Sequence, residues 1–385
     1  RSASSSEKVM RILVLIHEYP PVGGGGGRVA QDLCRRLAAA GHEIHLLTAR
    51  YGELLPLEEQ ENLTVERLSS WRREPFRADL KAMTSYVFAS IWRGLRLMKD
   101  WKPDVIHAHF AVPAGAAAWL LSILSGVPYV LTAHLGDVPG GVPEKTGKWF
   151  RWIFPLTPLI WRRARKVVAV SQFTRQLAQE SYPDVPVEVI PNGVDLKSLN
   201  PGDIAVHNPP RVVFAGRLMP QKNPLQVVRS LAAVRDLPWQ CEIVGDGPLM
   251  ETLRQEIVDQ DLQDRIELIG WVTPEAVLQA YARSDILFMP SLSEGLPVAG
   301  VQALAMGLAL VVSRIGGWDD LICDGENGTM VALDFPAGFE AALRNLLSSP
   351  EKLLAARLAS RKHAGMFALD RIATAYEEIF QSIKK

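Results

Sequence analysis

The sequence predicts an α/β protein made of two doubly wound domains, each built on a parallel sheet. Short β-rich runs alternate with helical stretches, as in successive βαβ units. Glycine-containing loops follow several of these runs, and the alternation starts again after a segment rich in Pro, Gly and Asn at 191–203. The chain has 385 residues, of which 48% are hydrophobic, so it is long enough to bury two cores.

The expected elements of the first half follow in a regular order. A β-rich run at 9–16, a glycine loop, a helical pattern at 28–40 and a strand at 43–48 form one βαβ unit. Further strands are expected at 105–107, 129–132, 166–170 and 187–190. Residues 110–133 carry no charge, but their prolines and glycines divide them into a short helix, a turn and a strand. We therefore expect a buried unit there and no membrane span.

The second half repeats this alternation. Strands are expected at 211–215, 240–244, 266–269, 286–290 and 310–313, and helices at 224–234, 249–260, 274–282 and 297–306. An amphipathic helix is expected at 367–385. In open parallel sheets, ligands bind beyond the carboxyl ends of the strands, so functional residues are expected in the loops at those ends.

Charge and cysteine content exclude several classes of protein. Lys and Arg number 42, as do Asp and Glu, and this balance argues against a nucleic-acid-binding protein. The two halves differ, with 24 basic against 19 acidic residues in 1–195 and 18 against 23 in 196–385. Cys34, Cys241 and Cys323 lie far apart, which indicates reduced thiols and a cytoplasmic protein. Residues 1–9 resemble an added tag before a native start at Met10.

The first glycine loop, Gly23–Gly27, lies directly after the first strand. Backbone N–H groups in such a loop can approach an anion, assisted by the start of the following helix. The loop is not a dinucleotide fingerprint, because Arg28 stands where the last glycine is needed. Two interpretations are open: the loop contacts an anion or a sugar, or it is merely a flexible connection.

Two cations follow the first strand of the second half. Gly216 and Arg217 end the strand, and Lys222 comes five residues later. A guanidinium and an ammonium group on one strand-end loop suit a diphosphate. Solvated surface charges are the alternative interpretation.

The segment SEGLP after the strand at 286–290 predicts the start of a helix. Pro297 is expected at the first helical position, and the free N–H groups of the first turn favour phosphate. Glu294 just before this turn is interpreted either as a carboxylate at a helix start or as a ligand for a sugar hydroxyl.

Histidines follow two strands of the first half. His134 and Asp137 come directly after one strand, where a structural role or a ligand contact is expected. His107 and His109 alternate at the end of another, but neither an acid nor a cysteine converges on them in the sequence. We therefore expect no metal site.

Taken together, the loops resemble the family-4 retaining glycosyltransferases of the GT-B fold. The resemblance covers about residues 10–380 and rests on seven motifs in the family's order: the N-terminal glycine loop, TAHLGD, IPNGVD, GRLMPQKN, VGDGP, SEGLP and IGGWDDLI. It implies two Rossmann-like domains facing across a cleft. It implies an acceptor-binding domain at 1–193, a donor-binding domain at 194–366 and a last helix at 367–385 that packs back on the first domain.

The resemblance also implies roles for individual residues. Four are implied as catalytic: Arg217 and Lys222 would neutralise the donor diphosphate in place of a metal, Glu294 would bind the transferred sugar, and His134 would lie near the reacting carbon. The residues implied to bind the donor are Gly24, Gly25, Asp137, Gly216, Gly245, Trp271, Val272, Gly295, Leu296, Pro297, Val298 and Gln302. No metal and no cofactor are implied, and the donor is expected to be UDP- or GDP-linked.

Two positions depart from the family pattern. The family has a second glutamate eight residues after the first, where this chain has Gln302. Gln keeps an acceptor oxygen but loses the charge, which is expected to weaken or alter binding of the donor ribose. The chain also has Asp320 where the family commonly has Glu.

The expected function is transfer of a sugar from a nucleoside diphosphate to an acceptor hydroxyl, with retention and without a metal. Two alternatives remain: a catalytically silent protein of the same fold, favoured by Gln302, and a dinucleotide-dependent oxidoreductase, disfavoured by the missing fingerprint. The acceptor is expected to be a glycan, a lipid-linked sugar or a small molecule.

The aromatic and basic segments 71–102 and 145–166 are interpreted either as solvated helix faces or as a surface for an anionic membrane at the cytoplasmic side.

Overall fold

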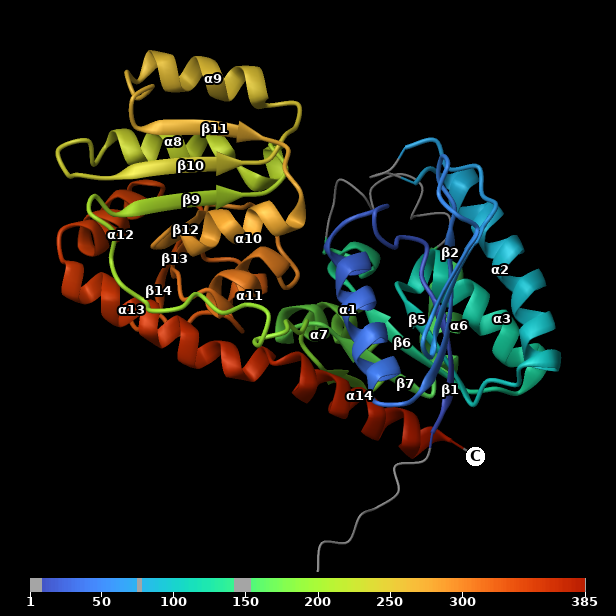
Figure 1. The fold of residues 1–385 in the computed structure, drawn as a ribbon. Helices are drawn as coiled ribbons and strands as arrows, with labels where there is room; N and C mark the ends of the chain where they lie inside the picture. Colours follow the sequence, from blue (N-terminus) through green and yellow to red (C-terminus); the bar gives the residue numbers. More distant parts are fainter. Residues whose placement is uncertain (1–8, 75–77, 142–153, 385) are drawn as a thin grey trace, which may run out of the picture. The chain divides into compact units, whose positions relative to one another are not determined.

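The computed structural model describes residues 9–74, 78–141 and 154–384, and the chain divides into two compact units (Figure 1). The first unit contains Arg1–Gly193 and Leu369–Lys385, and the second contains Val194–Ala368. The chain therefore passes from one unit to the other twice. At the junction, the Val194 N–H donates to the Phe367 carbonyl at 2.9 Å, so the two connecting segments are held together.

The sheet of the first unit has the strand order β3-β4-β2-β1-β5-β6-β7-β8. Its strands are β1 (Arg11–Leu15), β2 (Glu43–Ala49), β3 (Leu57–Gln60), β4 (Leu63–Leu68), β5 (Val105–His109), β6 (Tyr129–Ala133), β7 (Lys166–Ala169) and β8 (Val187–Val189). All neighbours are parallel except β3 and β4, which form an antiparallel edge. The strand order reverses between β1 and β5, which places the loops after these strands at the switch point of the sheet.

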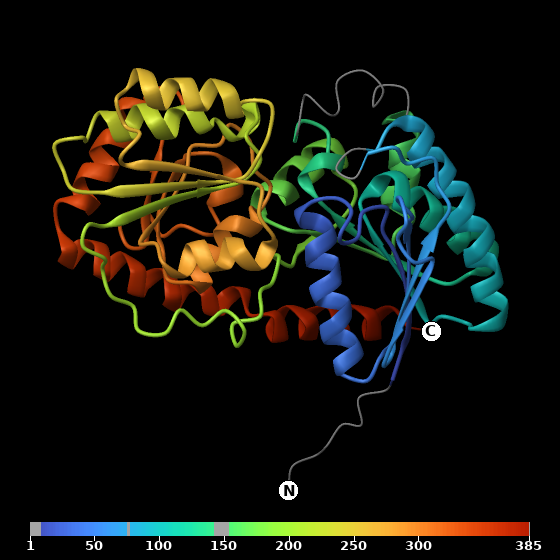
Figure 2. The ribbon, with the colours of Figure 1, turned by 45° about the horizontal axis from the view of Figure 1, so that its top comes forward.

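Helices cover both faces of this sheet (Figure 2). They are α1 (Gly25–Ala39), α2 (Leu80–Asp100), α3 (Ala116–Ser125), α6 (Thr157–Arg163), α7 (Gln172–Ser181) and α14 (Leu369–Ile383). Alternate residues of β1 belong to two different cores, because successive side chains of a strand point to opposite faces. Ile12 and Val14 pack in the core that contains α1 and α14, whereas Leu13 and Leu15 pack in the core with α2, α3 and α6.

The second unit has a six-stranded parallel sheet in the order β11-β10-β9-β12-β13-β14. Its strands are β9 (Arg211–Ala215), β10 (Gln240–Val244), β11 (Ile266–Gly270), β12 (Ile286–Met289), β13 (Ala309–Ser313) and β14 (Gly328–Val331). This is the 3-2-1-4-5-6 order of a doubly wound sheet, whose ligands bind where the order reverses. The switch point lies between β9 and β12, so the loops after these two strands are neighbours.

The helices of the second unit are α8 (Pro224–Ala232), α9 (Met250–Asp259), α10 (Pro274–Ala282), α11 (Val298–Ala305), α12 (Ala337–Leu347) and α13 (Pro350–His363). Apolar residues of α8, α9 and α12 form one core with inward-facing residues of β9 and β12 such as Phe214 and Phe288. Each unit thus has the parallel-sheet α/β architecture that the sequence predicts.

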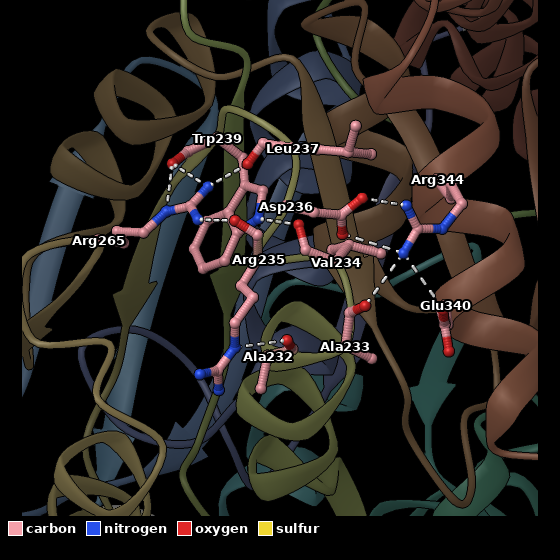
Figure 3. Close-up of polar contacts among 10 residues, drawn as sticks. All are labelled: Ala232, Ala233, Val234, Arg235, Asp236, Leu237, Trp239, Arg265, Glu340 and Arg344. Carbon is pink, nitrogen blue, oxygen red and sulfur yellow. Dashed lines mark hydrogen bonds and ion pairs between the residues drawn. The ribbon is translucent and has the colours of Figure 1, made fainter.

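Two arginines hold the connection between α8 and β10 (Figure 3). Arg265 donates to the carbonyls of Arg235, Leu237 and Trp239, and its guanidinium lies 3.7 Å from the centre of the Trp239 ring. Arg344 makes two hydrogen bonds to Asp236, at 2.6 and 3.1 Å. These contacts fix the segment that leads into β10.

The structure corrects several expected boundaries. Helix α1 begins at Gly25 rather than at residue 28, because the glycine run itself adopts the first helical turn. Helix α11 begins at Val298, so Pro297 precedes the first helical residue instead of occupying it. The strands β3 and β4 were not among the expected elements, whereas the long helix α2 lies within the segment 71–102 that was interpreted as a helix face. Strand β3 has exposed and half-buried residues, with no apolar face to mark it.

The uncharged stretch 110–133 forms α3 and β6, as expected. Across the parts of the chain that the structure describes, no helix has the length and apolarity needed to cross a membrane. The three cysteines carry free thiols, with Cys34 and Cys241 buried.

Candidate functional site

In the second unit, the loops after β9 and β12 are hydrogen-bonded to each other. The Leu292 N–H donates to the Gln221 carbonyl at 2.8 Å, and the Gln221 side-chain amide donates to the Ser293 carbonyl at 2.9 Å. These bonds connect the turn Pro220–Lys222 to the segment that leads into α11. Two loops far apart in the sequence therefore form one rigid platform at the switch point.

An ion pair lies in this platform. Lys222 Nζ lies 2.5 Å from Glu294 Oε1, and the side chains are only 17% and 8% exposed. A Cβ on Gly317 would lie 2.2 Å from the Glu294 carbonyl oxygen, so only glycine at 317 allows its loop to pack against this backbone. The loop at Gly317 thus packs against the Glu294 backbone, and Lys222 holds the Glu294 carboxylate.

Arg217 lies on the same loop as Lys222 and is exposed. Among the residues that the structure describes, its side chain makes no ion pair or hydrogen bond. A guanidinium that is not engaged within the protein remains available for an anionic ligand, which it can bind with two parallel hydrogen bonds.

Helix α11 starts directly after this ion pair. Its first turn has no side-chain cap, and the residues before it, Leu296 and Pro297, are buried. The N-terminal N–H groups of a helix carry partial positive charge and favour anions. Val298 is the first residue of this helix and Gln302 lies one turn further on; both are half-buried.

Gly245 lets the loops after β9 and β10 approach closely. Its φ is +140°, and a Cβ there would lie 1.9 Å from the Gly216 carbonyl oxygen. The Gly245 N–H donates to the Gly270 carbonyl at 2.9 Å, which links this point to the end of β11. Trp271 follows Gly270 and is 66% exposed, and Val272 is half-buried. The sequence-predicted residues of this unit therefore lie on adjoining loops at one edge of the sheet.

In the first unit, His134 lies at the carboxyl end of β6 in a cluster of rings. Its Nε2 is 3.3 Å from His109 Nδ1, and the Phe110 ring stacks on it at 4.3 Å between centroids. Burial lowers the pKa of His134 to about 4, against an opposing effect of the nearby Glu18 carboxylate. His134 is therefore neutral at pH 7.

His107 and His109 lie beside His134 at the carboxyl end of β5. Burial lowers the pKa of His107 to about 3, and it lowers the pKa of His109 well below the usual range. His107 Nε2 lies 2.8 Å from the Thr132 hydroxyl, which in turn lies 3.0 Å from the Tyr376 hydroxyl on α14. The helix α14 therefore contributes directly to the packing of the histidine cluster.

The glycine loop after β1 is held by a carboxylate that the sequence did not single out. Glu18 Oε2 accepts a hydrogen bond from the Gly24 N–H at 3.3 Å, and Glu18 Oε1 lies 3.6 Å from the buried Arg72 guanidinium. Gly25 begins α1 beside this contact. A lone glutamate after a strand has no distinguishing spacing. Its position before the glycine loop is the one signal in the sequence that marks it.

Two further points concern metal binding and the position of Asp137. It holds no group of three or more His, Cys, Asp and Glu side chains arranged to bind a metal ion. Asp137 ends the short turn Leu135–Asp137, and its side chain lies outside the described part.

The fold and the two groups of loops define a class of protein: an α/β protein with two doubly wound units. Two family models match the chain, Glycosyltransferase Family 4 at residues 23–198 and Glycosyl transferases group 1 at residues 209–349. An Escherichia coli UDP-Gal:alpha-D-GlcNAc-diphosphoundecaprenol alpha-1,3-galactosyltransferase is 30% identical over 267 residues, covering 64% of this chain and 67% of that protein. The glycogen synthase of Mycobacterium tuberculosis is 27% identical over 98% of this chain and 95% of its own.

Solved structures agree in fold. A sucrose-phosphate synthase from Thermosynechococcus elongatus matches with a TM-score of 0.84 at 18% identity, covering 97% of this chain and 99% of that chain. Anabaena HepE in complex with UDP-glucose matches with a TM-score of 0.76 at 20% identity, covering 97% and 100%. The chain belongs to the family-4 glycosyltransferases and has the GT-B fold; it is a glycosyltransferase enzyme.

Proposed function

We propose that the protein transfers a sugar from a UDP- or GDP-linked donor to an acceptor hydroxyl, with retained configuration and without a metal or cofactor. The observation that carries the proposal is the Lys222–Glu294 pair beside Arg217 and the uncapped start of α11. Two cations and a helix N-terminus at one strand edge are what a departing diphosphate requires. Anabaena HepE, which binds UDP and UDP-glucose, supports the choice of donor.

The proposed roles divide between the units. In the second unit, Arg217 and Lys222 neutralise the diphosphate while Glu294 accepts hydrogen bonds from the transferred sugar. Gly216, Gly245 and the segment Gly295–Leu296–Pro297–Val298 give backbone access to the donor. Trp271 and Val272 flank the base, and Gln302 meets the ribose. In the first unit, His134 and Asp137 lie near the transferred sugar, and Gly24 and Gly25 lie near phosphate and acceptor.

The proposed step proceeds on one face of the sugar. The bond between the anomeric carbon and the diphosphate oxygen breaks, and the acceptor oxygen bonds to that carbon from the same side. The acceptor proton passes to the departing phosphate oxygen. Positive charge on the sugar and negative charge on the phosphate both develop in this step, so Arg217 and Lys222 act most strongly in the transition state.

A thermal-shift panel of nucleotide sugars tests this proposal, because a ligand that binds only the folded protein raises its apparent stability. UDP- or GDP-sugars are expected to raise the melting temperature, and ones with other bases are expected to do so less. Absence of a shift with every nucleotide sugar would contradict the donor assignment. Binding without hydrolysis or transfer would favour the alternative, a silent binding protein whose activity was lost with the glutamate replaced by Gln302.

We also propose that α2 meets an anionic membrane at the cytoplasmic side, where a lipid-linked acceptor is collected. Phe88, Trp92 and Leu95 are exposed on one face of α2 at 70%, 59% and 39%. The same face carries Lys81, Arg96 and Lys99, with the Arg96 guanidinium 3.5 Å from the Trp92 ring centre. Helix α2 has no acidic residue before Asp100, so its apolar and basic face complements anionic lipid.

The rest of the basic segments contribute less than expected. Arg72 is buried, and Arg93 is paired with Glu66 at 2.6 Å. Of the second segment, Trp161 is fully buried in the core and Lys166 pairs with Glu188. Arg77, Lys145, Trp149 and Trp152 lie outside the described residues.

Vesicle co-sedimentation tests the membrane proposal. The protein is expected to sediment with vesicles that contain anionic lipid and to stay in solution with neutral ones, and R96E/K99E is expected to lose this binding. R254E, which reverses one exposed charge on α9, is the control for a reversal away from α2. Equal binding to neutral and anionic vesicles would contradict it.

A further inference from the structure

The glycine loop after β1 is folded around Glu18. A Cβ on Gly23, whose φ is +93°, would lie 2.5 Å from the Glu18 Cβ, and a Cβ on Gly27 would lie 2.6 Å from the Glu18 carbonyl oxygen. The Gly24 N–H donates to Glu18 Oε2 at 3.3 Å. Close packing against one glutamate therefore accounts for three positions of the glycine run without any ligand.

The Glu18 carboxylate is more exposed than the two basic groups beside it. Glu18 Oε1 lies 3.6 Å from the Arg72 guanidinium and 3.6 Å from His17 Nε2. The Arg72 and His17 side chains are 1% and 8% exposed, whereas the Glu18 side chain is 19% exposed. A molecule that approaches from solvent therefore meets the negative oxygens before it can reach the guanidinium.

The carboxylate has unused capacity for hydrogen bonds. Its two oxygens can accept about four. Among the described residues it accepts one, from the Gly24 N–H, while Arg72 and His17 lie at the longer distance of an ion pair. A carboxylate accepts hydrogen bonds and donates none, so the partner that completes its bonding is a donor such as a hydroxyl group.

Glu18 also lies at the ligand-binding edge of its sheet. It follows β1, and the strand order of the first sheet reverses between β1 and β5. The Glu18 carboxylate opposes the lowering of the His134 pKa, so the two residues lie within electrostatic reach of each other. A Cβ on Gly26, in the same loop, would lie 3.6 Å from His134 Nδ1. Glu18, the glycine loop and His134 are therefore grouped at one edge of the first unit.

We infer that Glu18 determines which group of the acceptor lies at the glycine loop: it binds a hydroxyl group and excludes a phosphate or carboxylate group. This role rests on the proposed function, in which the first unit binds the acceptor. A hydroxyl donates to the carboxylate, and the bond is strong because one partner is charged. An anionic group in the same place is repelled by the carboxylate and finds the Gly24 N–H already engaged.

Binding of inorganic phosphate tests the exclusion of anions. In the background R217A/K222A, which removes the proposed diphosphate site, E18A is expected to bind phosphate at least about tenfold more tightly than the background alone. The Gly24 N–H and the charge of Arg72 become available to the anion in this variant. E59A in the same background removes an exposed carboxylate of β3 and is the matched control, with no gain expected.

Isothermal titration calorimetry measures these affinities. E18Q keeps an oxygen for the Gly24 N–H and is expected to gain about threefold, and it replaces E18A if that variant does not fold. Phosphate affinities that match the E59A control in both Glu18 variants would overturn the inference.

A competition between two acceptors tests the hydroxyl contact. With a nucleotide sugar in aqueous glycerol, the protein can form free sugar or a glyceryl glycoside, and the ratio of these products does not depend on the amount of active protein. E18Q is expected to lower the ratio of glyceryl glycoside to free sugar about fivefold or more, because its neutral amide accepts a weaker hydrogen bond. E59A is expected to keep the wild-type ratio. An unchanged ratio in E18Q, or no glyceryl product from a wild type that hydrolyses the donor, would refute the hydroxyl contact.

The two experiments distinguish failure of this role from failure of the proposed function. If the wild type consumes no nucleotide sugar but E18A gains phosphate binding, the proposed function fails and the charge selectivity of the loop stands. If sugar is transferred but the Glu18 variants behave like E59A, the role of Glu18 fails and the proposed function stands.

Discussion

Lys222 Nζ and Glu294 Oε1 lie 2.5 Å apart although their residues are separated by 72 positions in the sequence. The loops that carry them follow β9 and β12, which are adjacent strands at the point where the strand order reverses. A lysine held by a carboxylate cannot turn away into solvent, so it is placed for a ligand in advance. This preorganisation is the structural basis for assigning the donor diphosphate to the second unit.

Removing the two cations is expected to abolish transfer. R217A/K222A should lose at least about a thousandfold in kcat/KM, because the loss of one such stabilising group costs on the order of a hundred- to a thousandfold. The measurement is initial-rate kinetics with a nucleotide sugar that binds in the thermal-shift panel. R254A, which removes an exposed arginine of α9, is the control and should remain near wild type. Near-normal turnover of the double variant with an intact fold would refute the assignment of Arg217 and Lys222.

Restoring the missing carboxylate tests the role of Gln302. Q302E places a charge one turn into α11, where it can accept stronger hydrogen bonds from ribose hydroxyls. We expect a several-fold lower KM for the donor with little change in kcat. Q279E adds the same charge on the exposed side of α10 and serves as the control. An unchanged KM in Q302E would place the ribose elsewhere.

Gly245 is expected to tolerate no side chain. A Cβ at this position would overlap the Gly216 carbonyl oxygen, so the loops after β9 and β10 must separate in G245A. We predict a loss of several kcal/mol in the free energy of unfolding of the second unit, together with loss of donor binding. Chemical denaturation provides the measurement. G325A also adds a Cβ at positive φ but meets no atom within 4 Å, and it should cost only about 1 kcal/mol. Similar losses in both variants would argue against the close approach as the cause.

The histidine cluster makes the first unit sensitive to acid. His107 and His134 have folded-state pKa values of about 3 and about 4, below the ordinary value of 6.5. At a pH between the ordinary value and the lowered value, the unfolded chain binds protons that the folded unit does not. The free energy of unfolding therefore falls as the pH falls. Below pH 6 each histidine is expected to lower the free energy of unfolding by about 1.4 kcal/mol per pH unit. Urea titrations from pH 7 to pH 5 measure this slope, and H107F is expected to reduce it by the contribution of one histidine, about 1.4 kcal/mol per pH unit. A slope that is unchanged in H107F would contradict the neutral buried state.

Much of this architecture could be predicted from the sequence, because parallel strands that are buried on both faces appear there as short apolar runs. Arg211–Ala215 and Gln240–Val244 were predicted with the bounds that the structure shows. The edge strand β3 was missed because it has no buried face. The helix α2 was anticipated only as a helix face within 71–102, without bounds, and it exposes Phe88 and Trp92 where a polar face is expected.

The site was only partly predictable for a related reason. Arg217, Lys222 and Glu294 stand at strand ends and in family motifs, so their residues could be named from the sequence. That Lys222 pairs with Glu294, that Glu18 holds the Gly24 N–H and that His109 faces His134 all depend on which strands are neighbours in the sheets. Spacing along the chain carries no information on these contacts.

Metal-independent transfer with retention determines the anomer of the first product, which can be observed. Proton NMR can follow the hydrolysis of a bound nucleotide sugar in EDTA, with water as the acceptor. We predict slow release of free sugar that first appears with the anomeric configuration of the donor and only later equilibrates. First appearance of the opposite anomer would contradict retention, and hydrolysis that stops in EDTA and returns with added metal would contradict metal independence.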